Sequence, residues 1–376
     1  MNFKRILVFR TGHLGDTLVA VPAFRSLREA FPSAEITYLS SADGDDPKYV
    51  SARDVLPATG LFDSWISYPK LSSGVRGLVS LLGLALDLRK KRFDAVIYLM
   101  TRYRTSSQID RDRLFFRFAG VRNVIGAEFV REHNLPFEIP RPTPRIESEA
   151  NFLIRLLQEN GLISQDLSFK PDVALTVEER SASLDWMDSN GVTAASRPRV
   201  AVGPGSKWES KIWDEARYAD IVDRLIGSHD AFPIIFGGPE DREKGDRLIA
   251  AWGRGANAAG ELNVRKAAAA LSECAIYLGN DTGTMHLAAS VGTPCVALFS
   301  AVDWVGRFEP IGDQHILFRR SVECEGCHSP VCVNQHTNKC LDLIAADDVY
   351  EACVSVLARA TRSGTDQDVL ERRFVQ

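Results

Sequence analysis

The chain has 376 residues, with 45 Lys and Arg against 49 Asp and Glu, and a formal net charge of -4. Its 45% apolar and 25% charged residues are typical of a globular protein and exclude a disordered chain, a collagen-like fibre and a small disulfide-bonded protein. The length predicts two domains, and the slightly acidic balance argues against a general nucleic-acid binder.

Charge is distributed unevenly along the chain. Residues 1–150 carry 22 Lys and Arg against 17 Asp and Glu, whereas the rest of the chain carries 23 against 32. The first part therefore has a net charge of +5 and the second a net charge of -9. This difference predicts different binding partners for the two parts.

The sequence contains no run long enough to span a membrane as a helix. The most apolar stretch, Leu78 to Leu88, covers about 11 residues and contains Gly83 and Asp87, whereas a span needs about 20. The apolar run before Arg10 is too short for the core of a signal peptide. We therefore expect a cytoplasmic protein whose seven cysteines stay reduced.

Predicted strands and helices alternate in the first half. In chain order they are a strand at 6–9, a glycine turn at 11–16, a helix at 18–30, a strand at 35–39, a helix at 78–92 and a strand at 94–99. Such alternation is typical of a parallel sheet covered by helices. The proline-rich segment 140–144 then interrupts the pattern.

A second alternating series follows two predicted helices at 148–161 and 177–190. It consists of strands at 199–202, 233–236, 275–278 and 295–299, the last of which ends the series, and of helices at 216–226, 267–272 and 285–291. We therefore predict an α/β protein with two sheets joined by a hinge near residues 145–197. A ligand is expected between the sheets, at the carboxyl ends of the strands.

The first glycine turn offers one candidate catalytic residue. Gly12 and Gly15 let backbone N–H groups approach an anion or a sugar closely, but a dinucleotide site needs a third glycine, so a nicotinamide-dependent oxidoreductase is disfavoured. Asp16 lies where the helix begins. It either stabilises the helix dipole or faces the interdomain cleft as a general base.

A second polar turn, Gly-Asn-Asp-Thr-Gly-Thr-Met-His, follows the strand at 275–278. Asp281 and Thr282 supply polar side chains there. The N–H groups of Gly283 and Thr284 lie at the start of the next helix, so the turn predicts a diphosphate site. His286 points back toward the turn in such a helix, although a lone helical histidine is otherwise a core residue.

Two more loops follow strands of the second half. Ser206 and a lysine at Lys207 or Lys211 predict contacts to phosphates, as a hydroxyl donor and a point charge. The alternative is an ordinary loop anchored by Trp213. Glu240, in a Gly-Gly-Pro-Glu-Asp sequence, either holds sugar hydroxyls or caps a helix.

Together the four loops resemble glycosyltransferase family 9, the ADP-heptose:lipopolysaccharide heptosyltransferase family. The matching elements are the opening strand with x-x-L-G-D at 6–16, K-x-W at 211–213, G-G-P-E-D at 237–241 and D-T-G-x-x-H-L-A at 281–288. The resemblance runs from residue 4 to about residue 345. It implies the GT-B type of α/β fold, with two facing Rossmann-like domains and a deep interdomain cleft.

The resemblance also implies a division of labour along the chain. Residues 1–170 are expected to form an acceptor-binding domain, 171–197 a linker, 198–350 a nucleotide-sugar-binding domain, and 351–376 a C-terminal helix or tail. Asp16 would deprotonate the acceptor hydroxyl for an inverting displacement, and Lys211 would neutralise the leaving diphosphate without a catalytic metal. The expected donor-binding residues are Ser206, Lys207, Glu240, Asp281, Thr282, Gly283, Thr284 and His286. Gly12 and His13 would lie at the acceptor.

A basic stretch in the first half carries Arg102, Arg104 and Arg113, after four consecutive cations at 89–92. Such a run is either a solvated face or a surface for a phosphorylated glycolipid at an anionic membrane. With the resemblance, it predicts a lipopolysaccharide-core acceptor and peripheral contact with the cytoplasmic face of the inner membrane.

Four cysteines lie within the segment 324–340: Cys324, Cys327, Cys332 and Cys340. Four thiolates are the ligand set of a tetrahedral metal site, so the cluster is either a structural zinc or iron site or a set of free thiols. His328 or His336 is able to replace one ligand. Cys274, Cys295 and Cys353 lie in apolar segments and are predicted to be core residues.

The leading hypothesis is an inverting glycosyltransferase with an ADP-heptose-like donor. A different nucleotide-sugar or a protein acceptor is an alternative within the same class. A non-catalytic nucleotide-binding protein of the same fold is a further alternative, but the intact Asp16, Lys211, Asp281 and His286 favour turnover.

Overall fold

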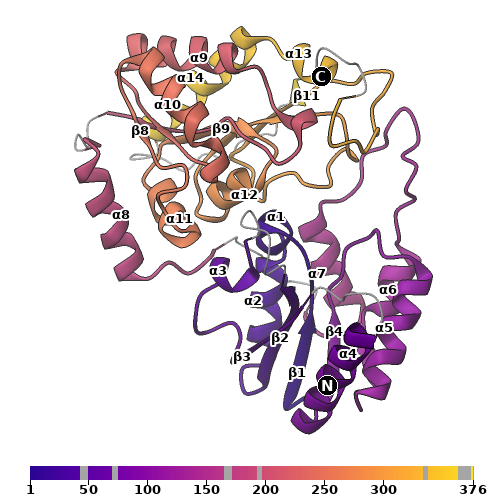
Figure 1. Cartoon of the computed structure of the whole chain (residues 1–376). Coiled ribbons are helices and arrows are strands. Elements are labelled where there is room, and N and C mark those ends of the chain that lie inside the picture. Colours follow the sequence, from indigo (N-terminus) through magenta and orange to yellow (C-terminus); the bar gives the residue numbers. More distant parts are fainter. Residues whose placement is uncertain are drawn as a thin grey trace. The chain divides into compact units, whose positions relative to one another are not determined.

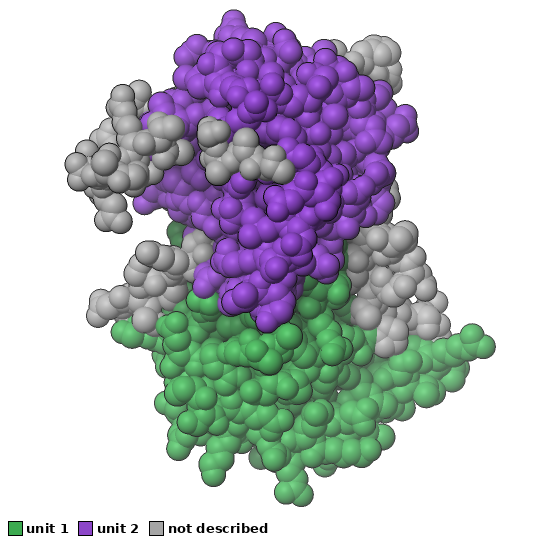
Figure 2. Space-filling view, turned by 90° about the vertical axis from the view of Figure 1, so that its left-hand side faces the viewer, with its two compact units in different colours: residues 1–138, 147–170 green, residues 139–146, 171–376 purple. Residues whose placement is uncertain are grey.

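The computed structural model describes residues 1–42, 50–69, 75–164, 172–192, 197–332, 338–362 and 374–375. The chain forms two compact units, coloured separately in Figure 2. Unit 1 comprises residues 1–138 and 147–170, and unit 2 comprises residues 139–146 and 171–376. The short segment 139–146 thus packs with unit 2 although unit 1 sequence flanks it on both sides.

Unit 1 is built on a five-stranded parallel sheet of order β3-β2-β1-β4-β5 (Figure 1). The strands are β1 (Arg5–Phe9), β2 (Glu35–Ala42), β3 (Ser64–Pro69), β4 (Ala95–Tyr98) and β5 (Asn123–Ile125). Strand β1 occupies the centre of this sheet. Its residues Ile6, Leu7 and Val8 are therefore fully buried, as the unbroken apolar sequence predicts.

The helices of unit 1 connect these strands and cover the sheet. They are α1 (Leu14–Leu18), α2 (Val21–Ala30), α3 (Ala52–Val55), α4 (Val75–Lys91), α5 (Ser106–Phe118), α6 (Ala127–Glu132) and α7 (Glu149–Glu159). The single helix predicted at 18–30 is wrong at its start. A separate helix α1 begins at Leu14, and α2 begins at Val21 with Pro22 in its first turn, where a missing N–H does no harm.

Unit 2 is built on a parallel sheet of order β12-β11-β10-β9-β6-β7-β8. Its strands are β6 (Arg199–Gly203), β7 (Phe232–Ile235), β8 (Ala256–Asn257), β9 (Ile276–Asn280), β10 (Cys295–Phe299), β11 (Ile316–Arg319) and β12 (Phe374–Val375). The strand at 295–299 is therefore not the last one. The sequence analysis missed β11 because its side chains are mostly half-buried and its apolar run is short.

Helices cover both faces of the unit 2 sheet. The helices are α8 (Val177–Ser189), α9 (Glu215–His229), α10 (Arg242–Trp252), α11 (Val264–Ser272), α12 (Gly283–Ser290), α13 (Lys339–Asp342) and α14 (Ala346–Arg362), with 3-10 turns η1 (Glu209–Lys211) and η2 (Pro239–Asp241). Figure 1 shows α9, α10 and α14 on one face and α11 and α12 on the other. The first three helices share one apolar core with alternate residues of β6, β9 and β10, including Val200, Ile276 and Val296.

Two further expectations concern the core cysteines and membrane-spanning helices. Cys274, Cys295 and Cys353 are buried, which confirms that they are core residues. Burial raises the pKa of the Cys274 and Cys353 thiols to about 12, so both stay protonated near neutral pH. Within the described ranges, no helix is both long and apolar enough to cross a bilayer.

Candidate active site

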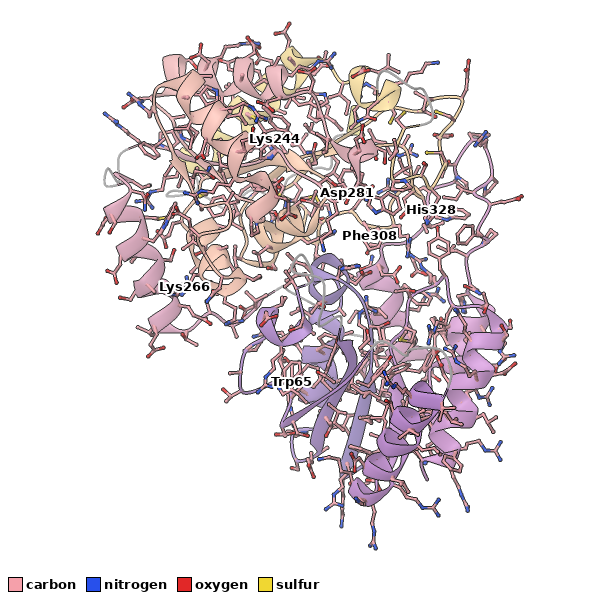
Figure 3. All side chains as sticks on the ribbon, viewed as in Figure 1. Trp65, Lys244, Lys266, Asp281, Phe308 and His328 are labelled. Atoms are coloured by element: carbon pink, nitrogen blue, oxygen red, sulfur yellow. The ribbon has the colours of Figure 1, made fainter. Side chains whose placement is uncertain are left out.

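The candidate site of unit 2 lies where its parallel strands end. Polar loops follow the carboxyl ends of β6, β7, β9 and β10, which are neighbours in the sheet, so the loops meet along one edge. Figure 3 shows the Asp281 side chain at this edge, just after β9. The loops predicted as the donor site are therefore brought together by strand order alone.

Asp281 and Lys211 form the central contact of this edge. The Lys211 Nζ donates to Asp281 Oδ2 at 2.6 Å, and the Asp281 side chain is only 7% exposed. Lys211 Nζ also lies 5.6 Å from the centroid of the Trp208 ring. Two residues 70 positions apart thus form a shielded ion pair, in which a cation is held ready beside a helix N-terminus.

Asn280, which the sequence analysis did not single out, joins the end of β9 to the loop after β6 and to helix α9. Its Oδ1 accepts hydrogen bonds from the Trp213 amide at 3.2 Å and from the Tyr218 hydroxyl at 2.9 Å. Its Nδ2 donates to the carbonyls of Pro204 and Gly205 at 3.1 and 3.3 Å. The sequence signal was an asparagine directly after an apolar strand. Asn280 is fully buried, and a buried polar side chain needs hydrogen-bond partners.

The turn after β9 leads directly into helix α12. Thr282 is its N-cap residue, and Gly283 and Thr284 are its first two positions. Their N–H groups point out of the helix start, where the helix dipole favours an anion. His286 is 94% buried one turn into the helix, and its ring meets the Phe308 ring edge-on at 6.1 Å.

The Tyr277 ring packs against the backbone at Gly203 and Gly279, next to the same turn. An added Cβ at Gly203 or Gly279 would lie 1.9 or 2.5 Å from the Tyr277 hydroxyl oxygen, so the ring fits only under glycines. Burial raises the pKa of Tyr277 far above its usual value, which keeps the phenol neutral.

The loops after β6 and β7 also interlock. A Cβ on Gly205 would lie 1.9 Å from Asp241 Oδ1, and Asp241 Oδ2 accepts from the Gly238 amide at 3.1 Å. Lys244 Nζ donates to the Pro204 carbonyl at 3.3 Å. Glu240 is exposed in η2, with its carboxylate folded over Gly238. The Gly-Gly-Pro-Glu-Asp loop therefore packs against the loop of Gly205 through Asp241.

The two remaining predicted donor residues lie on the loop after β6. Ser206 Oγ accepts a hydrogen bond from the Trp208 amide at 3.2 Å, and Lys207 is exposed. The structure therefore places all of the predicted donor-binding residues on the strand-end loops of unit 2 or on the first turn of α12.

The candidate site of unit 1 lies on the first strand-end loop. Asp16 belongs to α1, and its Oδ2 accepts from the His13 amide at 3.0 Å. Its carbonyl accepts from the buried Arg10 guanidinium at 2.9 and 2.6 Å, which fixes the backbone of the turn. A Cβ on Gly12 would lie 2.3 Å from the Asp16 Cβ, so only glycine leaves room for this carboxylate.

The arginines predicted at the acceptor have protein partners. Arg102 is buried, where its Nε donates to Glu149 Oε2 at 3.2 Å, and Arg104 forms an ion pair with Asp112. Arg113, which is 45% exposed, pairs with Glu128 at 3.0 Å. These contacts give Arg102 and Arg104 a structural use inside unit 1, and the acceptor-binding role of all three stays a prediction.

The four cysteines of 324–340 lie near one another in unit 2. Burial raises the pKa of the Cys340 thiol, and the nearby thiols of Cys332, Cys324 and Cys327 raise it further. The Ala301 amide donates to Cys340 Sγ at 3.3 Å. Among the residues that the structure describes, no three His, Cys, Asp or Glu side chains converge closely enough to hold a metal ion. His336 lies outside the described residues.

Two α/β units, each with polar loops at the carboxyl ends of its parallel strands, are the components of the GT-B type of fold. Residues 82–338 match the sequence pattern of glycosyltransferase family 9 (heptosyltransferase), and the chain belongs to this family. It is 25% identical over 313 residues to lipopolysaccharide heptosyltransferase 2 of Escherichia coli strain K12, a match that covers 78% of this chain and 82% of that protein.

Solved structures agree with this assignment at the level of the fold. The glycosyl transferase family 9 protein from Veillonella parvula has a TM-score of 0.72 and 21% identity, over 95% of this chain and 97% of that one. The E. coli ADP-heptose lps heptosyltransferase II has a TM-score of 0.66 and 20% identity, over 95% and 99% of the two chains.

Proposed function

We propose that this glycosyltransferase moves a heptose from ADP-heptose to a lipopolysaccharide-core acceptor, with inversion at the anomeric carbon. The observation that carries the proposal is the shielded Lys211–Asp281 pair beside the start of α12, in a chain whose curated relatives include a lipopolysaccharide heptosyltransferase. A lysine and helix-end N–H groups form a site for a diphosphate, the leaving group of a nucleotide-sugar.

The proposed reaction is a single displacement. The acceptor oxygen forms a bond to the anomeric carbon while the bond from that carbon to the diphosphate oxygen breaks, and ADP leaves. Asp16 takes the proton of the acceptor hydroxyl as general base. Lys211, the first N–H groups of α12 and Thr282 stabilise the negative charge that develops on the diphosphate.

Positive charge from the protein replaces a divalent metal in this proposal. Turnover is therefore expected to continue in EDTA at the rate measured with Mg²⁺. A rate that falls more than tenfold in EDTA and returns with Mg²⁺ would instead assign the diphosphate to a metal ion.

The decisive experiment measures nucleotide release from ADP-heptose and from other ADP-, UDP- and GDP-sugars, with lipopolysaccharide-core acceptors of increasing length. We expect the highest kcat/KM with ADP-heptose, and an NMR coupling constant in the product that shows the inverted anomer. Release from a UDP- or GDP-sugar alone would reassign the donor, and a retained anomer would exclude Asp16 as the base of a single displacement.

A further part of the proposal is peripheral contact with the cytoplasmic face of the inner membrane, through helix α4. Its apolar side chains Val75, Leu78, Val79, Leu82 and Leu86 are between 42% and 78% exposed, and their spacing places them along one face. Four exposed cations follow at 89–92. An apolar stripe with adjacent Lys and Arg matches an anionic lipid surface, where each cation adds about 1 kcal/mol.

Vesicle sedimentation tests this contact. The wild-type chain is expected to sediment with phosphatidylglycerol vesicles and not with phosphatidylcholine vesicles, and Leu78→Glu with Leu82→Glu is expected to abolish binding. Leu184→Glu, on the partly exposed face of α8, is the matched control. Equal sedimentation of all three proteins would overturn the contact, and a dimer that the α4 variant disrupts would assign the stripe to a second copy.

We also propose a structural zinc or iron at Cys324, Cys327, Cys332 and Cys340. The proposal rests on the ligand set, because four soft thiolates select these metals, and it requires the thiols to come closer together than they lie in the described structure. Elemental analysis is expected to find one equivalent of zinc or iron in the purified chain and none after Cys327→Ser with Cys332→Ser. A metal-free wild type would assign the cluster to free thiols.

A further inference from the structure

The 3-10 turn η1, which carries Lys211, packs against the stretch of unit 2 that contains the four cysteines. We call the described residues of this stretch, 324–332 and 338–340, the cysteine segment. Its Ser329 lies 119 positions after Ser210 of η1, so only the fold brings the two together. A lysine ends in a point charge on a flexible four-carbon stem, so the charge stays in one place only if the backbone that carries it is fixed.

Ser210, directly before Lys211, makes two hydrogen bonds to the cysteine segment. Its amide donates to the Pro330 carbonyl at 3.0 Å, and its Oγ donates to the Ser329 carbonyl at 2.6 Å. Both acceptors lie between the second and the third of the four cysteines. Ser210 is only 2% exposed, and buried polar groups are costly to leave without partners. These bonds therefore fix the backbone immediately before the lysine.

Asn338 holds both ends of the same turn. Its Nδ2 donates to the carbonyls of Glu209 and Ile212, at 2.9 Å in each case. Asn338 is the N-cap residue of α13, a position where asparagine normally accepts from the first amides of its own helix. In the described structure its side chain makes no such bond to α13. The amide group instead bridges the two carbonyls on either side of Ser210 and Lys211, which indicates a long-range role.

The Trp208 ring joins the cysteine segment to the ammonium group of Lys211. It meets the His328 ring edge-on, with 6.0 Å between the centroids, and its centroid lies 5.6 Å from Lys211 Nζ. The His328 amide donates to the Val302 carbonyl at 3.0 Å, beyond the end of β10. Figure 3 shows His328 at the strand-end edge that also carries Asp281. The cysteine segment thus reaches the lysine through an aromatic contact as well as through hydrogen bonds.

Lys211 is therefore held from two directions. Asp281 fixes its ammonium group, with 2.6 Å between Oδ2 and Nζ, and the cysteine segment fixes its backbone. We infer that the cysteine segment is the support that positions Lys211, and that Ser210 and Asn338 are its positioning residues. The inference rests on the proposed function for the task of Lys211, which is to neutralise the diphosphate. Ser210 and Asn338 act through Lys211 and not on the substrate.

The first test is Asn338→Asp, which keeps the size of the side chain and removes the Nδ2 donor. We expect kcat to fall about tenfold while the Kd for ADP-heptose stays unchanged, because a small displacement of Lys211 weakens a contact made in the transition state. Ser210→Ala removes a single bond and is expected to lower kcat less. Asn123→Asp is the matched control, since its Nδ2 donates to the Asp94 carbonyl in unit 1 at 3.0 Å. Wild-type kcat in both test variants would overturn the inference.

A double-mutant cycle separates positioning from a general role in the fold. In the background of Lys211→Met there is no ammonium group to position, so Asn338→Asp is expected to lower kcat no further. A residue that serves only the fold lowers kcat by the same factor in both backgrounds, and that result would overturn the inference. Ser210→Ala in the same background gives the answer if Asn338→Asp does not fold.

Reductive methylation of lysines gives a readout that is independent of turnover and of the donor. Mass spectrometry follows Lys211, whose side chain is 16% exposed, and Lys90, which is 78% exposed, in the same sample. We expect Lys211 to react several-fold faster in Asn338→Asp and in Ser210→Ala than in the wild type, and Lys90 to react equally in all three. Equal rates for Lys211 would overturn the positioning even if the enzyme transfers heptose.

The proposed function fails on a different result. Full activity of Lys211→Met would remove the task proposed for Lys211. Faster methylation of Lys211 in the two variants would then still establish that the cysteine segment positions this lysine.

Discussion

The two units use the same local element, a strand, a polar turn and a helix, in different ways. In unit 1, Asp16 lies inside the short helix α1, is partly exposed, and accepts from its own turn at the His13 amide. In unit 2, Asp281 precedes α12, is buried, and is held by Lys211 from another loop. In the proposed reaction the first carboxylate takes a proton from the substrate, whereas the second positions a cation.

The largest expected effect on activity comes from a substitution of Asp16, the carboxylate of unit 1. Asp16→Asn keeps the size of the side chain but removes the base, so kcat is expected to fall by about 10³ while the Kd for ADP-heptose stays the same. Steady-state kinetics and calorimetry measure both quantities.

Asp54→Asn is the matched control for Asp16. Asp54 accepts from the Ser51 amide at 3.1 Å at the start of α3, the same capping contact that Asp16 makes. If both variants lost the same activity, or if Asp16→Asn kept full activity, Asp16 would be a helix-capping residue and not the base.

The next largest effect on activity is expected from loss of the Lys211–Asp281 ion pair of unit 2. Lys211→Met removes the cation and leaves Asp281 buried without it, so kcat is expected to fall about 10²–10³-fold, as for the loss of one preorganised donor to a transition-state charge. Lys244→Met, whose ammonium group bonds a carbonyl, is the control. The comparison fails if both lysine variants lose the same activity.

The comparison is sharpened by a smaller change at the support of the unit 2 loops. Gly205→Ala puts a methyl group 1.9 Å from Asp241 Oδ1, which must shift, at a cost of about 1–3 kcal/mol in the free energy of unfolding. Gly227→Ala, in α9 where nothing lies within 4 Å, is expected to stabilise by up to about 1 kcal/mol. Denaturant titration of both variants tests the contrast, and equal effects would contradict it.

The smallest expected effect is a pH dependence away from both sites. Hydrogen bonds from Arg265 lower the pKa of Glu179, which joins α8 to α11, against a smaller opposing effect of burial. Because the folded pKa is the lower one, the stabilisation is fully present above the unfolded value near 4.5 and is lost as the pH falls through the folded value.

Glu179→Gln is therefore expected to lower the free energy of unfolding by about 1 kcal/mol at pH 7, and the difference should shrink below pH 4. A difference that stays constant from pH 7 to pH 3 would exclude ionisation of Glu179 as its cause.

Local patterns in the sequence were sufficient for the strand-end loops and insufficient for long-range pairing. Asp281 was singled out because it directly follows a buried apolar strand, whereas Lys211 was singled out from Lys207 only by the resemblance to the K-x-W element. Arg102 was interpreted as part of a basic surface because its partner Glu149 lies 47 residues later. Charge counting does not reveal such a pair.

The cavity of about 580 Å³ within unit 2 was missed for the same reason. Its walls combine Thr143, Ser300 and Phe308, each unremarkable in its own segment, and only the packing of 139–146 against unit 2 brings them together. The α1 and α2 helices were merged into one because Pro22 is tolerated in a first turn and so gives no sign of an interruption.

The position of the segment 139–146 limits how the chain can be cut into fragments or recombined with its relatives. The Ile146 amide donates to the Val305 carbonyl at 2.9 Å, and the Thr143 amide donates to Glu325 at 2.7 Å, so two separate stretches of the chain form one compact unit. A fragment that starts at residue 171 lacks one wall of its own cavity. Exchange of unit 2 between relatives therefore requires that both stretches be transplanted together, and a single crossover point does not achieve it.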